Sequence, residues 1–210
     1  MPTVSVHITA NSDNASQLVG GALVQTPLLA GFVVAANDLG LRFQSVNVPN
    51  AANITVATVT MNVTNVTGAP VTTMYGVAAD NVATWNDPAN LPSAATRTTA
   101  NADPDPAGAG TKVVTVTTLV QEIVNRVPWV GGNAMGFVVI DGAGAGNNTF
   151  TIEALADAGT AEAVLDITYT TPGVWPTTTI LTSEPFRGDV TPPSVATFGG
   201  RAWERGKQGW

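Results

Sequence analysis

Two pairs of carboxylates have the residue types and spacing that could support catalysis. Asp80 with Asp87, and Asp103 with Asp105, could face one another like the acid and base of a glycosidase. Asp80 precedes Asn81, and the other three each precede a proline; in such turn-forming sequences aspartate usually shapes the backbone. We therefore expect no enzymatic activity and rank a polysaccharide hydrolase behind any binding function.

Histidine and cysteine offer little further chemistry. His7 is the single histidine and the chain has no cysteine, which excludes a disulfide framework, a thiolate metal site and a multi-histidine zinc site. We interpret His7 as an ordinary surface or core residue of an N-terminal strand. Aspartates in loops are hard oxygen ligands suited to Ca²⁺, but no EF-hand spacing occurs. Structural calcium stays an open alternative without assigned ligands, and no cofactor is expected.

Three aromatic residues could bind a sugar. Tyr75, Trp85 and Trp129 are candidates for stacking on a sugar ring, with polar groups beside them. The competing interpretation, which we favour, is that Trp85 anchors a long loop and Trp129 packs a helix onto the core.

Short strands must position these side chains. Alternation of apolar and polar residues predicts strands, and two changes of parity predict kinks or bulges, near Ser45 and at Ala57-Thr58. The expected strands are 4–8, 41–48, 54–63, 71–77, 112–117, 135–140, 149–154 and 164–170. Eight or nine short strands separated by turns predict an all-β protein, a jelly-roll β-sandwich.

One short helix is expected, at about residues 118–126, where it would cap an end of the sandwich. Its apolar residues recur at helical spacing, Thr118 with Gln121 predicts a capping box, and Pro128 ends the helix. Residues 80–111 lack strand rhythm and are expected to form a long excursion over one face.

Charge is scarce and unevenly distributed. Charged residues make up 11% of the chain, against roughly 25% in ordinary domains, and the net charge is −7. Residues 1–172 hold twelve acids and only four cations: Arg42, Arg97, Lys112 and Arg126. The acidic balance argues against nucleic acid as a partner. The sequence has no run of about 18 apolar residues and no signal-peptide pattern, so we expect synthesis in a host cytoplasm and no membrane association.

The last 38 residues differ from the rest. We expect three parts: an N-terminal strand or arm segment (1–29), a jelly-roll domain (30–172) and an extended C-terminal arm (173–210) rich in Pro, Gly and Trp. Large aromatics in such an arm should be buried against a neighbour, as anchor residues are at interfaces. The candidates for subunit contact are Trp175, Phe186, Arg187, Phe198, Arg201, Trp203 and Trp210.

A family resemblance covers roughly residues 30–171. The segments that carry it are Gly40–Pro49, Ala52–Ala57, the region of Trp85, Arg97–Ala100, Leu119–Arg126, Trp129, Gly132-Asn133 and Val164–Tyr169. In their order they resemble the DNRLRE-type, carbohydrate-binding-like modules of bacterial surface proteins. The resemblance implies a jelly roll with the helix at one end. It also implies either a sugar binder or a structural unit, since such modules occur in cell-surface proteins and in phage structural proteins.

The favoured expectation is a non-enzymatic structural protein of a bacteriophage virion, either a capsid decoration (cement) subunit or a tail-associated subunit. Its partners would be other virion proteins and further copies of itself, with a trimer as one form. The alternative is a carbohydrate-binding adhesion module that recognises a host surface glycan.

Overall fold

The structure, a computed structural model, describes residues 1–18, 21–25, 28–32, 36–85, 89–142, 148–155 and 162–171, with backbone only for residues 29–32 and 36. The seven subunit-contact candidates of the expected C-terminal arm lie outside the described residues. Residues 1–173 form one compact unit. The N-terminal segment contributes strands to that unit, because β1 (Thr3–His7) pairs with β12 (Val164–Thr170) and β2 (Asn14–Gln17) pairs with β5 (Ala36–Phe43).

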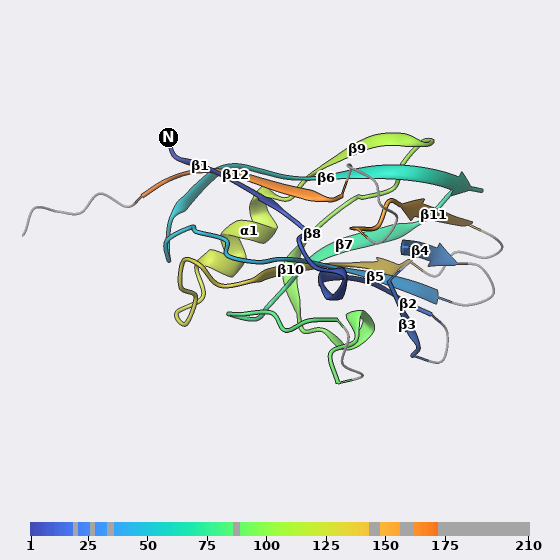
Figure 1. The fold of residues 1–210 in the computed structure, drawn as a ribbon. Coiled ribbons are helices and arrows are strands. Elements are labelled where there is room, and N and C mark those ends of the chain that lie inside the picture. Colours follow the sequence, from blue (N-terminus) through green and yellow to red (C-terminus); the bar gives the residue numbers. More distant parts are fainter. Residues whose placement is uncertain are drawn as a thin grey trace, which may run out of the picture. The chain divides into compact units, whose positions relative to one another are not determined.

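Two antiparallel sheets form a β-sandwich (Figure 1). The first sheet contains β1 (Thr3–His7), β12 (Val164–Thr170), β6 (Asn53–Thr67), β11 (Asn148–Ile152), β4 (Leu28–Phe32) and β9 (Gly110–Thr115). The second contains β3 (Leu23–Val24), β2 (Asn14–Gln17), β5 (Ala36–Phe43), β10 (Met135–Asp141), β7 (Thr72–Val77) and β8 (Arg97–Ala102). The start of β5 pairs with β4, which joins the two sheets. The all-β sandwich predicted from the sequence is therefore confirmed.

The long strand β6 organises the first sheet. β9 pairs along one side of it, while β12 and β11 follow one another along the other side. Its buried and exposed residues alternate, so one face packs inward and one faces outward. The bulge expected at Ala57-Thr58 falls instead at Thr55, opposite the step from Thr168 to Tyr169. The kink expected near Ser45 is confirmed, since Ser45 has a φ of 55° just after β5.

The core lies between the two sheets. Alternate side chains of both inner faces are buried there, as the period of two requires. Phe43 of β5 and Phe137 of β10 meet edge to face, with ring centroids 6.0 Å apart. Each sheet thus covers the apolar face of the other.

Helix α1 (Thr117–Val124) lies between the sheets, against β6 on one side and β7 and β8 on the other (Figure 1). Its buried face is Leu119, Val120, Ile123 and Val124, as the helical spacing predicts. The predicted capping box is wrong. The N-cap is Val116, without a side-chain cap, and Gln121 instead bonds the backbone of Ala52 and Ile54.

The structure has more strands than the sequence indicated. β2, β3, β4 and β8 were not expected, because they are short or carry Gly, Ala and Asn in place of an alternating pattern. The excursion expected over residues 80–111 is correspondingly shorter, since β8 begins at Arg97. It contains the 3-10 turn η2 (Pro92–Ala94), and a second such turn, η1 (Asn11–Asp13), precedes β2. No helix among the described residues has the length and apolar character needed to cross a membrane.

Candidate functional site

The outer face of the second sheet is partly covered by residues 78–85 and 89–96, which we call the covering loop. A small second hydrophobic cluster lies beneath it, formed by Ala15, Val77 and Val138 of the strands with Val82 and Trp85 of the loop. The Trp85 backbone N–H donates to the carbonyl of Ser12 at 2.9 Å, which ties the loop to η1. Trp85 is 2% exposed, so its predicted role as the anchor of the excursion is confirmed.

Gly40 of β5 is what allows Trp85 to lie so close to the sheet. A Cβ added at Gly40 would lie 2.7 Å from Cε2 and 2.9 Å from Cδ2 of the indole, and 3.0 Å from Pro92. The two distances to the indole are shorter than real Cβ contacts, and the indole ring is rigid. The absence of a side chain at Gly40 is therefore a packing requirement of the covering loop.

Gly40→Ala is expected to displace Trp85 and to lower the free energy of unfolding by about 1–3 kcal/mol, the usual cost of overpacking. Urea unfolding followed by far-UV circular dichroism measures the loss, and tryptophan emission reports the movement of the ring. Gly108→Ala is the matched control, because a Cβ at Gly108 meets nothing within 4 Å. Equal stability of the two variants would contradict the assigned packing.

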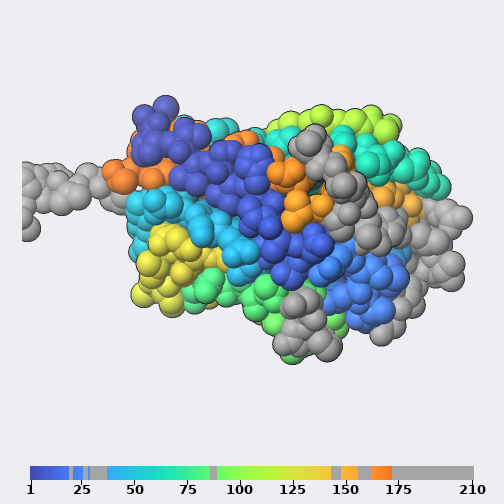
Figure 2. All heavy atoms as spheres, viewed as in Figure 1, coloured from blue at the N-terminus to red at the C-terminus, as the bar shows by residue number. Residues whose placement is uncertain are grey.

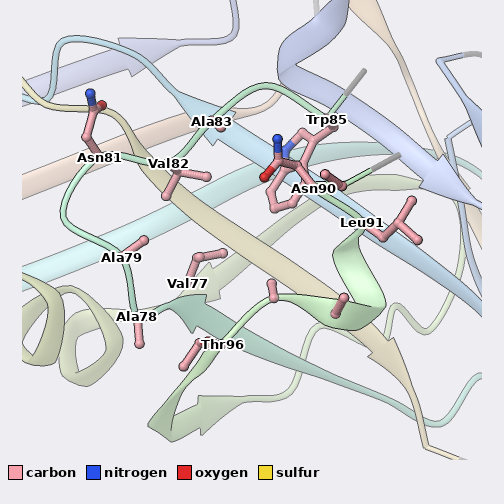
Figure 3. A pocket seen from close by; sticks show the side chains of 13 residues that line it. Val77, Ala78, Ala79, Asn81, Val82, Ala83, Trp85, Asn90, Leu91 and Thr96 are labelled. Carbon is pink, nitrogen blue, oxygen red and sulfur yellow. The ribbon is translucent and has the colours of Figure 1, made fainter. Parts of the chain in front are cut away.

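A pocket of about 310 Å³ opens between the covering loop and the end of β7 (Figure 3). Alanines at positions 78, 79, 83, 89, 94 and 95 make up much of its wall, together with Val77, Val82 and Leu91. Asn90 and Thr96 add polar groups, whereas the Asn81 side chain already accepts the backbone N–H of Ala134 at 2.9 Å. Such a lining suits a small, largely apolar group with one or two hydrogen bonds.

Trp85 also carries an unusual polar atom. Its Nε1 is buried and has no hydrogen-bond partner among the described residues. A buried donor without a partner costs free energy. Among the described residues, the indole is therefore held by packing contacts.

A buried ion pair fixes the sheet and the covering loop to each other. Asp13 is fully buried, and Arg42 Nη1 and Gln44 Nε2 each donate to one of its oxygens at 2.5 Å. Arg42 Nε also donates to the carbonyl of Val82 at 2.6 Å. Each oxygen of the carboxylate therefore accepts a hydrogen bond, and the buried negative charge has a positively charged partner, as burial of a charge requires.

Two further carboxylates are destabilised by their surroundings. Burial raises the pKa of Asp38 above its ordinary value, although the Asp141 backbone N–H and the charge of Arg97 oppose that shift. Burial likewise raises the pKa of Asp105, opposed by hydrogen bonds from Thr72. Ionisation of either group therefore costs the folded state free energy.

Asp38→Asn is expected to raise the unfolding midpoint at pH 7. Because the folded-state pKa of Asp38 is raised, the folded protein holds this proton more tightly than the unfolded chain does, and stability falls as pH rises through that pKa. The variant should therefore lose its advantage near pH 3, where aspartate is protonated. Thermal unfolding between about pH 3 and 7 tests this. Asp166→Asn removes the same charge from the outer face of the first sheet as a control; a pH-independent effect at Asp38 would contradict the assignment.

Three of the four carboxylates considered as catalytic pairs make bonds within the fold. Asp80 is paired with Arg126 at 2.6 Å, and Asp87 lies outside the described residues. Asp103 Oδ1 accepts the backbone N–H of Asp105 at 2.8 Å, which confirms the turn interpretation. Asp105 in turn accepts from the backbone and side chain of Thr72.

The remaining single residues are also placed. His7 forms a surface pair with Glu162, with 3.1 Å between Nδ1 and Oε1. No group of three His, Asp or Glu side chains able to hold a metal ion occurs within the described ranges. Trp129 is 1% exposed and its Nε1 donates to the carbonyl of Val48 at 2.9 Å, which confirms its packing role. Tyr75 is half-buried, and the guanidinium of Arg97 lies 5.5 Å from its ring centroid.

Sequence reasoning missed the buried Asp13–Arg42–Gln44 network. Asp13 lies 29 residues before Arg42, so no spacing rule links them. The one available signal was Arg42 itself, a cation between Leu41 and Phe43 in an apolar strand of a weakly charged protein. Such a residue needs a buried partner.

No family model matches the chain, and no curated protein matches it.

Proposed function

We propose that this chain is a non-enzymatic structural subunit of a bacteriophage virion, a capsid decoration or tail-associated protein that works through contacts between subunits. It would share its origin with the DNRLRE-type modules that residues 30–171 resemble. Its localisation would be the virion, and its partners would be other virion proteins and further copies of itself.

The observation that supports this proposal is the distribution of the positively charged residues along the chain. Each of the four cations in residues 1–172 has a partner within its own subunit. Arg42 binds Asp13, Arg126 binds Asp80, Lys112 donates to the carbonyl of Asp105, and Arg97 contacts Ser93 and Tyr75. The other four cations all fall in the last 24 residues, beside large aromatics. This division favours a C-terminal segment that binds the acidic body of a neighbouring subunit.

The test uses full-length chains in particles. Mass spectrometry of purified particles should find the wild-type chain, and replacing Trp203 and Trp210 by Ser should reduce its incorporation at least tenfold. Replacing the exposed Val127 and Val130 by Ser is the control and should leave incorporation unchanged. Absence of the wild-type chain from particles would overturn the proposal.

A carbohydrate-binding adhesion module is the second candidate, and the pocket beside Trp85 favours it. Trp85 itself is 2% exposed, but the carboxamide of Asn90 and the hydroxyl of Thr96 in the pocket are groups that sugar sites use for hydrogen bonds. A glycan array tests this candidate, with Asn90→Ala as the variant that should lose binding without unfolding. Binding that survives Asn90→Ala would place any glycan elsewhere.

A further inference from the structure

The two sheets have free edges, and most of those among the described residues are protected. Unpaired backbone groups at a sheet edge invite another strand, so proteins usually block them. On β8 the Glu122 carboxylate of α1 accepts the backbone N–H groups of Thr99 and Ala100 at 2.8–3.0 Å. β3 has only two residues, and β1 ends at His7, which is paired with the Glu162 carboxylate at 3.1 Å.

β9 lacks these protections. All six of its residues pair with β6, and no described strand pairs with its other side. Figures 1 and 2 show it along the rim of the molecule. Its sequence, Gly-Thr-Lys-Val-Val-Thr, has no proline and no acid. Its single charge, Lys112, is half-buried and donates to the carbonyl of Asp105.

The outward residues of β9 and of the part of β6 that pairs with it are uncharged and partly apolar, and the acids of this face lie farther from the edge, at Glu153, which bonds Asn62, and at Asp166 of β12, opposite Thr58. Thr111, Val113 and Thr115 face outward on β9, opposite Asn62, Thr60 and Thr58 of β6. Val113 is 54% exposed. Two copies of a chain with net charge −7 repel one another over most of their surfaces, so a neutral edge is where they can approach.

We propose that β9 is a self-association site, at which the β9 strands of two copies pair antiparallel about a two-fold axis and join their first sheets. Residues directly opposite in an antiparallel pair point to the same face, so outward residues must meet outward residues. Two central registers satisfy this condition. In one register Lys112 lies opposite Lys112 of the second copy, and repulsion between the like charges disfavours it. In the other register Val113 lies opposite Val113 of the second copy. The second register is the one expected.

This contact is small, so the dimer is a weak one. It concerns the isolated full-length chain and does not depend on the proposed function. Sedimentation equilibrium over a tenfold range of chain concentration should show a reversible shift from the chain mass toward twice that mass.

Charge variants at Val113 give the first test. Val113→Lys and Val113→Glu should each weaken association by roughly tenfold or more, because each places like charges opposite one another. An equimolar mixture of the two variants should restore it, since opposite charges then meet. Val71→Lys is the matched control, since Val71 is 53% exposed and lies outside β9. A wild-type chain that stays monomeric, or an unchanged Val113→Lys dimer, would overturn the proposal.

A cysteine at the same position gives a second test that does not rely on charge. The chain has no cysteine, so Val113→Cys introduces a single thiol. Opposed Cβ atoms about 4.5–5.5 Å apart can close to disulfide distance with small adjustment. Mild oxidation should give a disulfide-linked dimer of Val113→Cys at least tenfold faster than of Val71→Cys. Equal rates of disulfide formation in the two variants would show that the thiols meet by random collision, and would contradict pairing of the two β9 strands.

Discussion

Replacing Arg42 by Met is expected to lower the free energy of unfolding by about 3–5 kcal/mol, because it leaves the Asp13 carboxylate buried without its cation. Asp13 is fully buried and the Arg42 side chain is only 13% exposed, so water cannot take the place of the guanidinium. The carbonyl of Val82 loses its donor in the same change. Urea unfolding followed by circular dichroism measures the difference.

Two comparisons make the Arg42 result specific. Arg126→Met removes an ion pair of similar geometry whose side chains are 33% and 30% exposed, and it should cost less than about 1 kcal/mol. The double variant Asp13→Leu with Arg42→Met removes both charges and should be more stable than Arg42→Met alone. If Arg42→Met costs no more than Arg126→Met, the network does not fix the covering loop.

Trp129→Ala is expected to cost about 3–5 kcal/mol, the range for deleting a fully buried aromatic side chain. The indole fills space between the loops that follow β5 and α1, and its Nε1 bonds the carbonyl of Val48. Trp129→Phe keeps most of the volume but leaves that carbonyl without its donor, so it should cost about 1–3 kcal/mol. Chemical denaturation of both variants gives the order of these losses.

The control for Trp129 lies two residues away. Val127 is 92% exposed, and Val127→Ala should change stability by less than about 0.5 kcal/mol. Because Trp129 was also a glycan candidate, loss of sugar binding in Trp129→Ala has meaning only in protein that remains folded. A stable Trp129→Ala chain that lost glycan binding would contradict the packing role and support the sugar site.

The strands that alternate clearly were predictable from their residues. Buried apolar residues such as Leu41 and Phe43, or Leu165 and Ile167, occur at every second position, because one face of the strand packs into the core and the other faces water. Strands such as β2, with Asn, Ala, Ser and Gln, carry no such signal. β2 forms because β5 offers it a hydrogen-bonding edge and because the covering loop shields it, neither of which is local.

Helix α1 likewise has features that the sequence predicted and features that depend on the tertiary structure. Its position followed from the spacing of its apolar residues and from Pro128. The role of Gln121 was misjudged and none was predicted for Glu122, because both side chains bond backbone groups far away in sequence. Gln121 bonds Ala52 and Ile54, and Glu122 protects the edge at Thr99 and Ala100. Local capping rules cannot anticipate partners that only the fold brings near.

The sequence by itself therefore determined the class of fold and the sparing use of charge, since both follow from composition and from short periods along the chain. Only the tertiary structure decided that Asp13 meets Arg42, that Trp85 lies on Gly40, and that no strand of the described part of the chain pairs with the outer edge of β9. These outcomes depend on which distant segments become neighbours, and that choice is made by the packing of the whole core.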